Sequence, residues 1–181
     1  MKLILLLTLL AITSANVMTL APAAESGVMA PALKIASHCS PQEKVIFSCA
    51  TTNAKIISLC SSSILTASEG YLQYRFGPAG KPELIYPATM EHPSKHFQFG
   101  QSFYSSGGGM YLKFKNGEYT YALYSMSTKF GEDRAGVAVR KSVEEFAYAY
   151  IPCKGKSHDE MDIDDFEKIK IPRDPKEEQI P

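Results

Sequence analysis

The sequence has no surplus of charge of either sign, because its 181 residues include 19 lysines and arginines and 19 aspartates and glutamates. A protein that binds nucleic acid through the phosphates needs a basic surplus, so we expect no nucleic-acid partner. The apolar fraction of 45% is too high for a chain that is disordered throughout. The length fits one domain, since domains most often have about 100–150 residues.

Long hydrophobic runs are also missing, except for one short run at the N-terminus. Residues 3–12 are almost entirely apolar, and this run is about half the ~20 residues that a transmembrane helix needs. Lys2 precedes the run and small residues follow it, which is typical of a secretory signal peptide. We therefore predict a signal peptide over residues 1–15, cleaved after Ala15 or Ala23, no transmembrane anchor after cleavage, and a periplasmic or secreted location.

The cysteines contain no closely spaced pair of the CxxC type that thiolate zinc sites usually show. An even number of cysteines in an exported chain predicts two disulfide bonds, formed among Cys39, Cys49, Cys60 and Cys153. The spacing leaves all three connectivities open. Because Cys153 is far from the others in the sequence, we expect at least one bond to close a long loop and so to restrict the unfolded chain.

Aromatic residues locate the folded part of the chain. All ten tyrosines and eight of the nine phenylalanines lie between Cys39 and Cys153, and aromatic side chains bury large areas. We therefore predict a folded domain over residues 38–153. Residues 16–37 are rich in alanine and proline with little periodicity, which predicts a flexible spacer.

Residues 154–181 have nine acidic and six basic residues, and we interpret them as an acidic tail. A short helix is predicted there, because Ser157 and Glu160 have capping-box spacing and a later proline, Pro172, ends the pattern. Ile163 and Phe166 fall on one side of this helix. Phe166 is the residue expected to dock onto the domain.

No helical periodicity of useful length appears within the domain, and short segments of alternating or apolar character predict strands instead. We place eight of them at residues 44–49, 55–60, 71–76, 83–86, 110–124 (a hairpin of two), 135–140 and 146–151, with residues 97–104 as the candidate for a ninth. Short connections between successive strands favour an all-β antiparallel meander. Closure into a small barrel would remove exposed edges, and a sandwich is the alternative.

The hairpin at residues 110–124 gives the strongest local signal. Asn116-Gly117 accepts the positive φ angles of a type I′ turn. This turn would place Phe114 opposite Tyr119, and it would leave one face of the hairpin apolar and the other polar.

Catalytic motifs are absent: there is no Gly-x-Ser-x-Gly segment and no evident grouping of Ser, His and Asp. We therefore predict a non-enzymatic protein that needs no cofactor. His92 and His96 have the spacing of two metal ligands on a helix. Pro93 lies between them, so two loop histidines are the better interpretation, with a metal site as the alternative.

Two groups of residues are candidates for contact with a partner. Ser105, Ser106 and Gly107 belong to a small loop that leads into a strand rather than a helix, which argues against a phosphate loop. Such a loop at the rim of a barrel can insert into the cleft of another protein. Lys113 and Lys115 alternate with aromatic residues on the polar face of the hairpin, an arrangement that can bind sugars or bases but more often faces solvent.

Three segments carry a resemblance: residues 39–60, YLQYRFGPAGKPELIYP at 71–87, and SGGGMYLKFKNGEYTYALYS at 106–125. They resemble a group of small exported bacterial proteins of unassigned function. More distantly, the chain is similar to the periplasmic inhibitors of C-type lysozyme, on the segments Phe47-Ser48-Cys49 and Ser106-Gly107-Gly108. This resemblance implies an eight-stranded antiparallel barrel with a rim loop that fills the lysozyme cleft.

These observations predict an exported, disulfide-stabilised, non-enzymatic binding module whose partner is a protein or an envelope component. The most specific form of this prediction is an inhibitor of a foreign hydrolase such as lysozyme that acts through residues 105–109. One alternative is a small hydrolase or metal-binding protein that uses His92 and His96. Another is a structural or assembly factor of the envelope that makes contact through its acidic tail.

Overall fold

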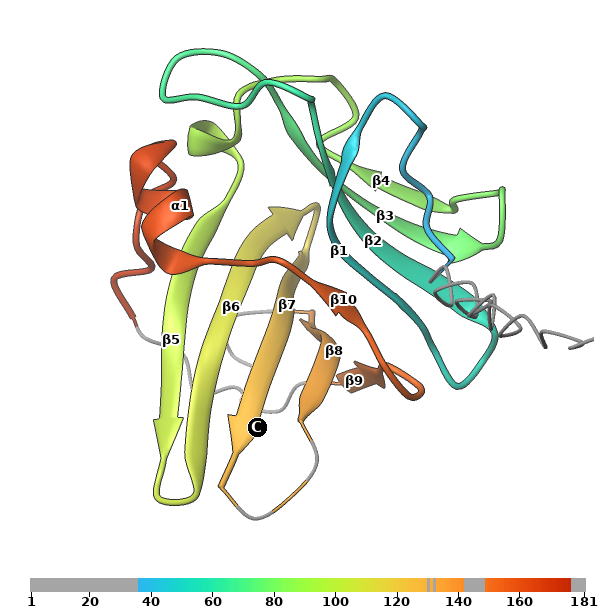
Figure 1. Ribbon diagram of the computed structural model, residues 1–181, viewed down its shortest axis with the longest axis vertical. Helices are drawn as coiled ribbons and strands as arrows, with labels where there is room; N and C mark the ends of the chain where they lie inside the picture. The colour runs from blue at the N-terminus through green and yellow to red at the C-terminus, as the bar shows by residue number, and fades with distance from the viewer. Residues whose placement is uncertain (1–35, 130, 132, 142–148, 177–181) are drawn as a thin grey trace, which may run out of the picture. The chain divides into compact units, whose positions relative to one another are not determined.

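The computed structural model describes residues 36–176 except 130, 132 and 142–148. The predicted signal peptide lies outside these residues, and so does all of the predicted spacer but residues 36 and 37. The described chain forms two five-stranded antiparallel sheets, one 3-10 helix and one short α-helix (Figure 1). None of the described helices has the length and apolar character required to cross a membrane.

The order of strands follows the chain within each sheet, apart from β10. Sheet 1 has the order β10-β1-β2-β3-β4, with β1 (Lys44–Ala50), β2 (Lys55–Ser61), β3 (Leu72–Pro78), β4 (Leu84–Tyr86) and β10 (His158–Asp159). Sheet 2 has the order β5-β6-β7-β8-β9, with β5 (Gln98–Tyr104), β6 (Gly107–Asn116), β7 (Tyr119–Thr128), β8 (Arg134–Arg140) and β9 (Ala149–Pro152). The predicted antiparallel meander is therefore confirmed in two separate runs.

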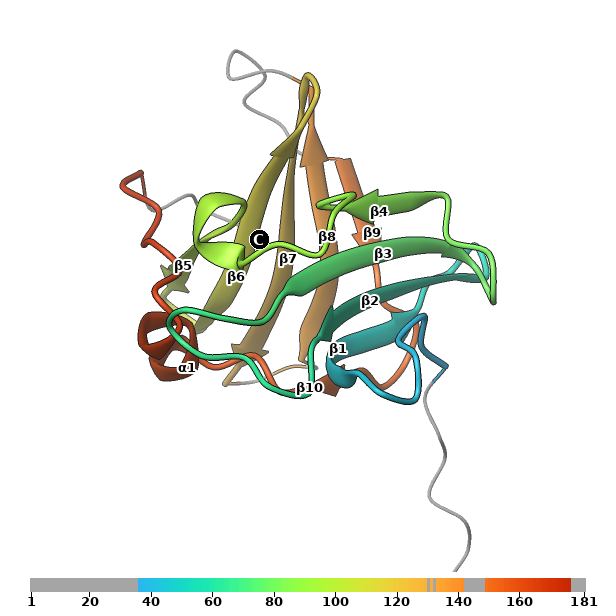
Figure 2. The same ribbon diagram turned by 90° about the horizontal axis from the view of Figure 1, so that it is seen from above.

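The predicted closed barrel is wrong, and a sandwich-like arrangement of two sheets fits the described strands better. Strands of the two sheets cross at a steep angle (Figures 1 and 2). β4 has only three residues and is followed by Pro87 and by the 3-10 helix η1 (Pro93–Lys95), so the chain leaves sheet 1 before β5 begins. An isolated bridge between Thr51 and Cys153 joins the sheets at one corner.

The core lies between the facing sides of the sheets, as the alternation of apolar residues requires. Phe47, Leu59 and Tyr74 occupy paired positions on sheet 1 and are fully buried. Phe114 of sheet 2 stacks on Tyr121, with ring centroids 4.9 Å apart, and on Tyr86 of sheet 1, at 4.4 Å. Stacked aromatic pairs add about 0.5–1.5 kcal/mol to the burial of their area, so this stack holds the two sheets together.

The hairpin of β6 and β7 is present, but its register differs from the prediction. Phe114 pairs with Tyr121 rather than Tyr119, and the two loop residues are Gly117 and Glu118. Only Gly117 has a positive φ, of 60°. A type II′ turn needs positive φ at its first central residue alone, so Asn116 stays in the strand. The pairing moves by two residues, and each side chain keeps its predicted face.

Both predicted disulfides are present, and none of the four cysteines is free. Cys39 is bonded to Cys60, 21 residues away, and Cys49 to Cys153, 104 residues away. The expected long loop is therefore confirmed. The second bond lies at the corner where the bridge at Thr51 joins the sheets.

The C-terminal segment is part of the folded body. The predicted helix is α1 (Ile163–Lys168), and Phe166 docks into the core with 3% of its surface exposed. Its N-cap is Asp162, which accepts a hydrogen bond from the Asp165 amide at 3.1 Å, instead of the capping box predicted at Ser157. Beyond the helix, the chain runs beside β5, because the Asp174 amide donates to the Phe99 carbonyl at 2.7 Å.

Candidate functional site

A groove of about 1230 Å³ lies where β5 ends and β6 begins. The end of β5, the start of β6 and the end of β7 form its floor, and the chain between residues 152 and 163 contributes a wall. Cys153 belongs to this wall, so the corner disulfide fixes one side of the groove.

Small residues make the floor of the groove. A β-carbon at Gly107 or Gly109 would overlap a carbonyl oxygen of β7, that of Ser127 or Ser125. A β-carbon at Gly108 would lie 2.8 Å from the ring of Phe103, so this ring sits over the glycine. The three consecutive glycines therefore have a packing role: they let β5, β6 and β7 lie close together beneath a shallow surface.

An exposed aromatic side chain stands beside the groove. Phe103 on β5 has 66% of its surface exposed, although it belongs to a regular strand. The next residues, Ser105 and Ser106, form the exposed turn of the β5–β6 hairpin. The carbonyl of Ser106 accepts a hydrogen bond from the Lys129 amide at 2.8 Å, which ties the turn to the end of β7. Large apolar side chains that are exposed to solvent on a regular strand can mark contact surfaces.

Charged side chains of both signs line the walls. Asp133 accepts a hydrogen bond from the Ser127 hydroxyl at 2.9 Å, and Asp159 accepts one from the Met161 amide at 3.0 Å. Lys129 and Arg134 also line the groove. The groove therefore presents mixed polarity around one aromatic side chain, which suits a protein surface better than a lipid.

The structure does not bring the five predicted contact residues together. Ser105, Ser106 and Gly107 lie at the groove, whereas Lys113 and Lys115 lie near the opposite end of β6. Lys113 is mostly buried and forms an ion pair with Asp174.

Asp174 was not predicted from the sequence, because it follows Pro172 in a segment interpreted as a tail. Its side chain is 1% exposed and accepts a hydrogen bond from the Tyr111 hydroxyl at 2.8 Å as well as the bond from Lys113. Burial alone would raise the pKa of Asp174, but the hydrogen bonds from Lys113 and Tyr111 outweigh it and hold the pKa below its usual value. This contact fastens the C-terminal segment to sheet 2.

The two histidines of the alternative metal site have separate partners. His92 places Nδ1 2.9 Å from the Ser94 hydroxyl and Nε2 2.9 Å from the Thr66 carbonyl oxygen. His96 places Nε2 2.9 Å from a Glu91 carboxylate oxygen. Across the residues that the structure describes, no three His, Cys, Asp or Glu side chains are grouped so that they could hold a metal. The histidines serve to shape the connection around η1.

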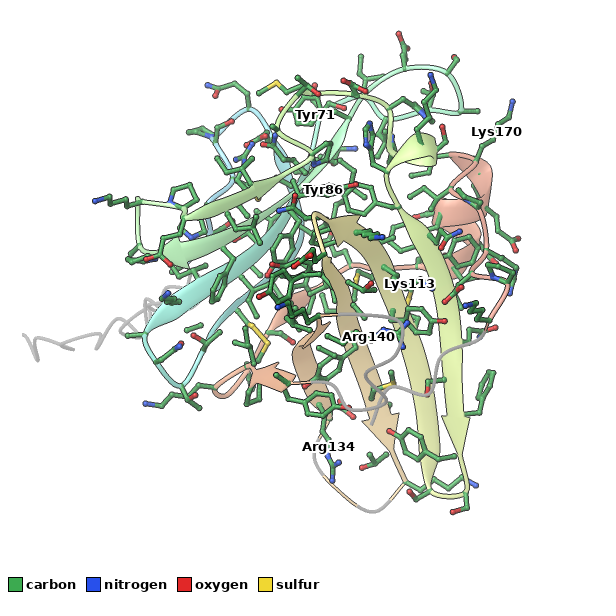
Figure 3. All side chains as sticks on the ribbon, turned by 180° about the vertical axis from the view of Figure 1, so that it is seen from behind. Tyr71, Tyr86, Lys113, Arg134, Arg140 and Lys170 are labelled. Atoms are coloured by element: carbon green, nitrogen blue, oxygen red, sulfur yellow. A yellow bond between two sulfur atoms is a disulfide. The ribbon has the colours of Figure 1, made fainter. Side chains whose placement is uncertain are left out.

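A second buried ion pair, which was not predicted from the sequence, lies on the outer side of sheet 1. The Arg75 guanidinium donates two hydrogen bonds to the Glu43 carboxylate, at 2.6 and 2.8 Å. Burial alone would raise the pKa of Glu43, but hydrogen bonds from Arg75, the Ser40 amide and Tyr71 lower it to about 2. Tyr71 is labelled in Figure 3. Strongly shifted pKa values can mark functional sites, but this pair fastens residues 36–43 onto the sheet.

Comparisons of the chain with protein-family models, curated proteins and solved structures found no match. The resemblance to lysozyme inhibitors, and to small exported bacterial proteins, therefore stays a prediction.

Proposed function

We propose that the protein is an exported binding module that contacts a protein partner through the groove and the turn of the β5–β6 hairpin. The observation that carries this proposal is the exposure of Phe103 on a regular strand at the edge of the groove. Aromatic anchors of this kind supply much of the binding energy in protein interfaces. The two disulfides are consistent with an exported, stabilised module.

Rigidity of the floor supports a role in binding. β6 and β7 are ten residues long and pair along their whole length, and the disulfide of Cys153 fixes the wall. A surface that is already ordered loses little conformational entropy when a partner binds. The groove therefore needs no large rearrangement to accept a partner.

Inhibition of a hydrolase such as lysozyme is the most specific form of this proposal. In it, the turn at Ser105 and Ser106 enters the cleft of the enzyme, and Phe103 covers the cleft's rim. The exposure of all three side chains supports this form. A lysozyme activity assay with the purified protein tests it, and an undiminished rate at excess protein removes it while leaving other protein partners open.

Site-specific photo-crosslinking tests the general proposal. A photoreactive phenylalanine analogue replaces Phe103 in one variant and Met90 in another, and each variant is exposed to envelope and host extracts. Met90 is a matched control, since it is 65% exposed and lies in the connection before η1. We expect a defined protein adduct from position 103 and none from position 90.

Substitution of the same two residues supplies the second measurement. Phe103→Ala should weaken binding of the crosslinked partner by about tenfold or more, because loss of an anchor costs roughly 2 kcal/mol. Met90→Ala should leave binding unchanged. Adducts of equal yield at both positions, or equal affinity of both alanine variants, would contradict the proposal.

A further inference from the structure

A second concave site lies at the opposite end of β6 and β7 from the groove. Its volume is about 440 Å³, within the range of small-molecule sites. Strands of sheet 2 form one side. Ser94 and Lys95 of η1 and the C-terminal segment around Pro172 and Lys176 also line it. Residues far apart in the sequence therefore meet there.

Among the described residues, basic side chains dominate the lining of this site, which we call the basic pocket. They are Lys95, His96, Lys113, Lys115, Arg140 and Lys176, and Asp174 is the single acid among those described. Figure 3 labels Lys113 and Arg140 on sheet 2. The whole chain has no net charge, so the imbalance is local. A cleft lined by one sign of charge focuses the electrostatic potential and attracts ions of the opposite sign.

Part of this charge is already compensated. Asp174 pairs with Lys113, and Glu91 pairs with His96. Three other lysines of the pocket are exposed and form no ion pair within the described part of the chain: Lys95, Lys115 and Lys176. Three ammonium groups at one pocket therefore remain for an external anion.

Neutral polar groups complete the lining. Ser94, Thr120 and Gln98 also line the pocket, and Tyr86 contributes an aromatic side chain. A volume of about 440 Å³ is larger than a free inorganic anion needs. The lining thus suits an organic ligand that carries several negatively charged oxygen atoms, with hydroxyl groups to meet the neutral donors.

We propose that this pocket binds the phosphoryl group of an organic phosphate ester, through Lys95, Lys115 and Lys176. A phosphate monoester carries close to two negative charges at neutral pH and three acceptor oxygens, which matches three separate cations better than a carboxylate does. The ester is either a soluble sugar phosphate or the headgroup of a phospholipid. The site is separate from the groove and does not depend on the function proposed above.

Isothermal titration calorimetry on the full-length protein tests this proposal. The soluble probes are glucose 6-phosphate, glucuronate and glucose. The lipid probes are vesicles of phosphatidylcholine with or without phosphatidic acid, whose headgroup is a phosphate monoester. We expect binding of glucose 6-phosphate or of the vesicles that contain phosphatidic acid, weakened by added salt. Which of the two binds identifies the source of the phosphoryl group. Glucuronate should bind more weakly than the phosphate ester, and glucose not at all.

Two triple variants locate the binding. One carries Lys95→Gln, Lys115→Gln and Lys176→Gln, and its control carries Lys44→Gln, Lys81→Gln and Lys156→Gln at exposed positions outside the pocket lining. Both lose three positive charges. The first should lower the affinity by about tenfold or more, and the second by less than about twofold. Equal losses, no binding of either phosphate probe, or glucuronate binding as tight as the ester would overturn the proposal.

Discussion

At the scale of single residues, two buried ion pairs fasten the segments that flank the β strands. Arg75 and Glu43 are 32 residues apart in the sequence, and Lys113 and Asp174 are 61 apart. No local pattern connects such residues, so sequence reasoning detected neither pair and placed Asp174 in a tail. Lys113 was predicted as a contact residue for a partner, and in the structure it forms an ion pair with Asp174 of the same chain.

Replacing Glu43 by glutamine should destabilise the protein markedly. The Glu43 side chain is 3% exposed, and the substitution leaves the Arg75 charge buried without its counterion, which costs roughly 3–5 kcal/mol when one partner of a buried pair is lost. Equilibrium urea unfolding measures the change. Glu83→Gln is the control, because Glu83 pairs with Lys55 in solvent, where such pairs contribute about 1 kcal/mol or less. Equal losses would contradict the account.

The same carboxylate should make stability depend on pH. The pKa of Glu43 is about 2 in the folded protein, against a usual value of 4.5. A lowered folded-state pKa stabilises the protein fully above about pH 4.5, and this contribution is lost as the pH falls towards 2. Its size is about 3 kcal/mol, since a pKa difference of one corresponds to about 1.4 kcal/mol.

Unfolding free energies measured over this acidic range provide the check. The difference between the wild-type protein and Glu43→Gln should shrink as the pH falls, because protonation removes the charge that the variant lacks. A difference that stays constant from neutral pH down to about pH 2 would show that Glu43 titrates normally or is not paired.

At the scale of elements, the sequence was a good guide to the strands and a weaker guide to their turns. Short apolar runs located β1 and β2, and alternation of apolar residues located β3 and the β6–β7 hairpin, because burial of one face imposes alternation. The two possible turns differ in the position that Gly117 takes: it is the second loop residue of a type I′ turn or the first of a type II′ turn, and both positions accept glycine. The Asn-Gly pair therefore predicted the hairpin correctly and its register incorrectly.

The two disulfides should contribute unequally to stability. In the chain-entropy model, the bond across 104 residues is worth roughly 5 kcal/mol and the bond across 21 residues roughly 3 kcal/mol. Each pair has one fully buried cysteine, Cys49 or Cys60, so paired serine variants are comparable. Thermal unfolding should show a larger loss for Cys49→Ser with Cys153→Ser than for Cys39→Ser with Cys60→Ser. The reverse order would contradict the long-range role of the corner bond.

At the scale of the whole described chain, the main error of the prediction was a single closed barrel where the structure has two separate sheets. Short connections determine that successive strands are neighbours within a sheet. Whether the strands close into one barrel depends on the path of a single longer connection. Residues 87–97 carry the chain from β4 to β5 without pairing them. The candidate site was also predicted only in part. The turn at Ser105 and Ser106 was identified, whereas the groove beside it depends on residues 152–163, which pack against sheet 2 from a distant part of the sequence.

Two disulfide bonds brace the fold, and the bond between Cys49 and Cys153 joins the two sheets at one corner, beside the groove. Non-reducing peptide mapping of the protein isolated from its native source tests this most directly. We expect two cross-linked peptide pairs, one joining Cys39 to Cys60 and the other joining Cys49 to Cys153, with no free thiol. Either of the other two connectivities, or reactive thiols in the native protein, would contradict the account.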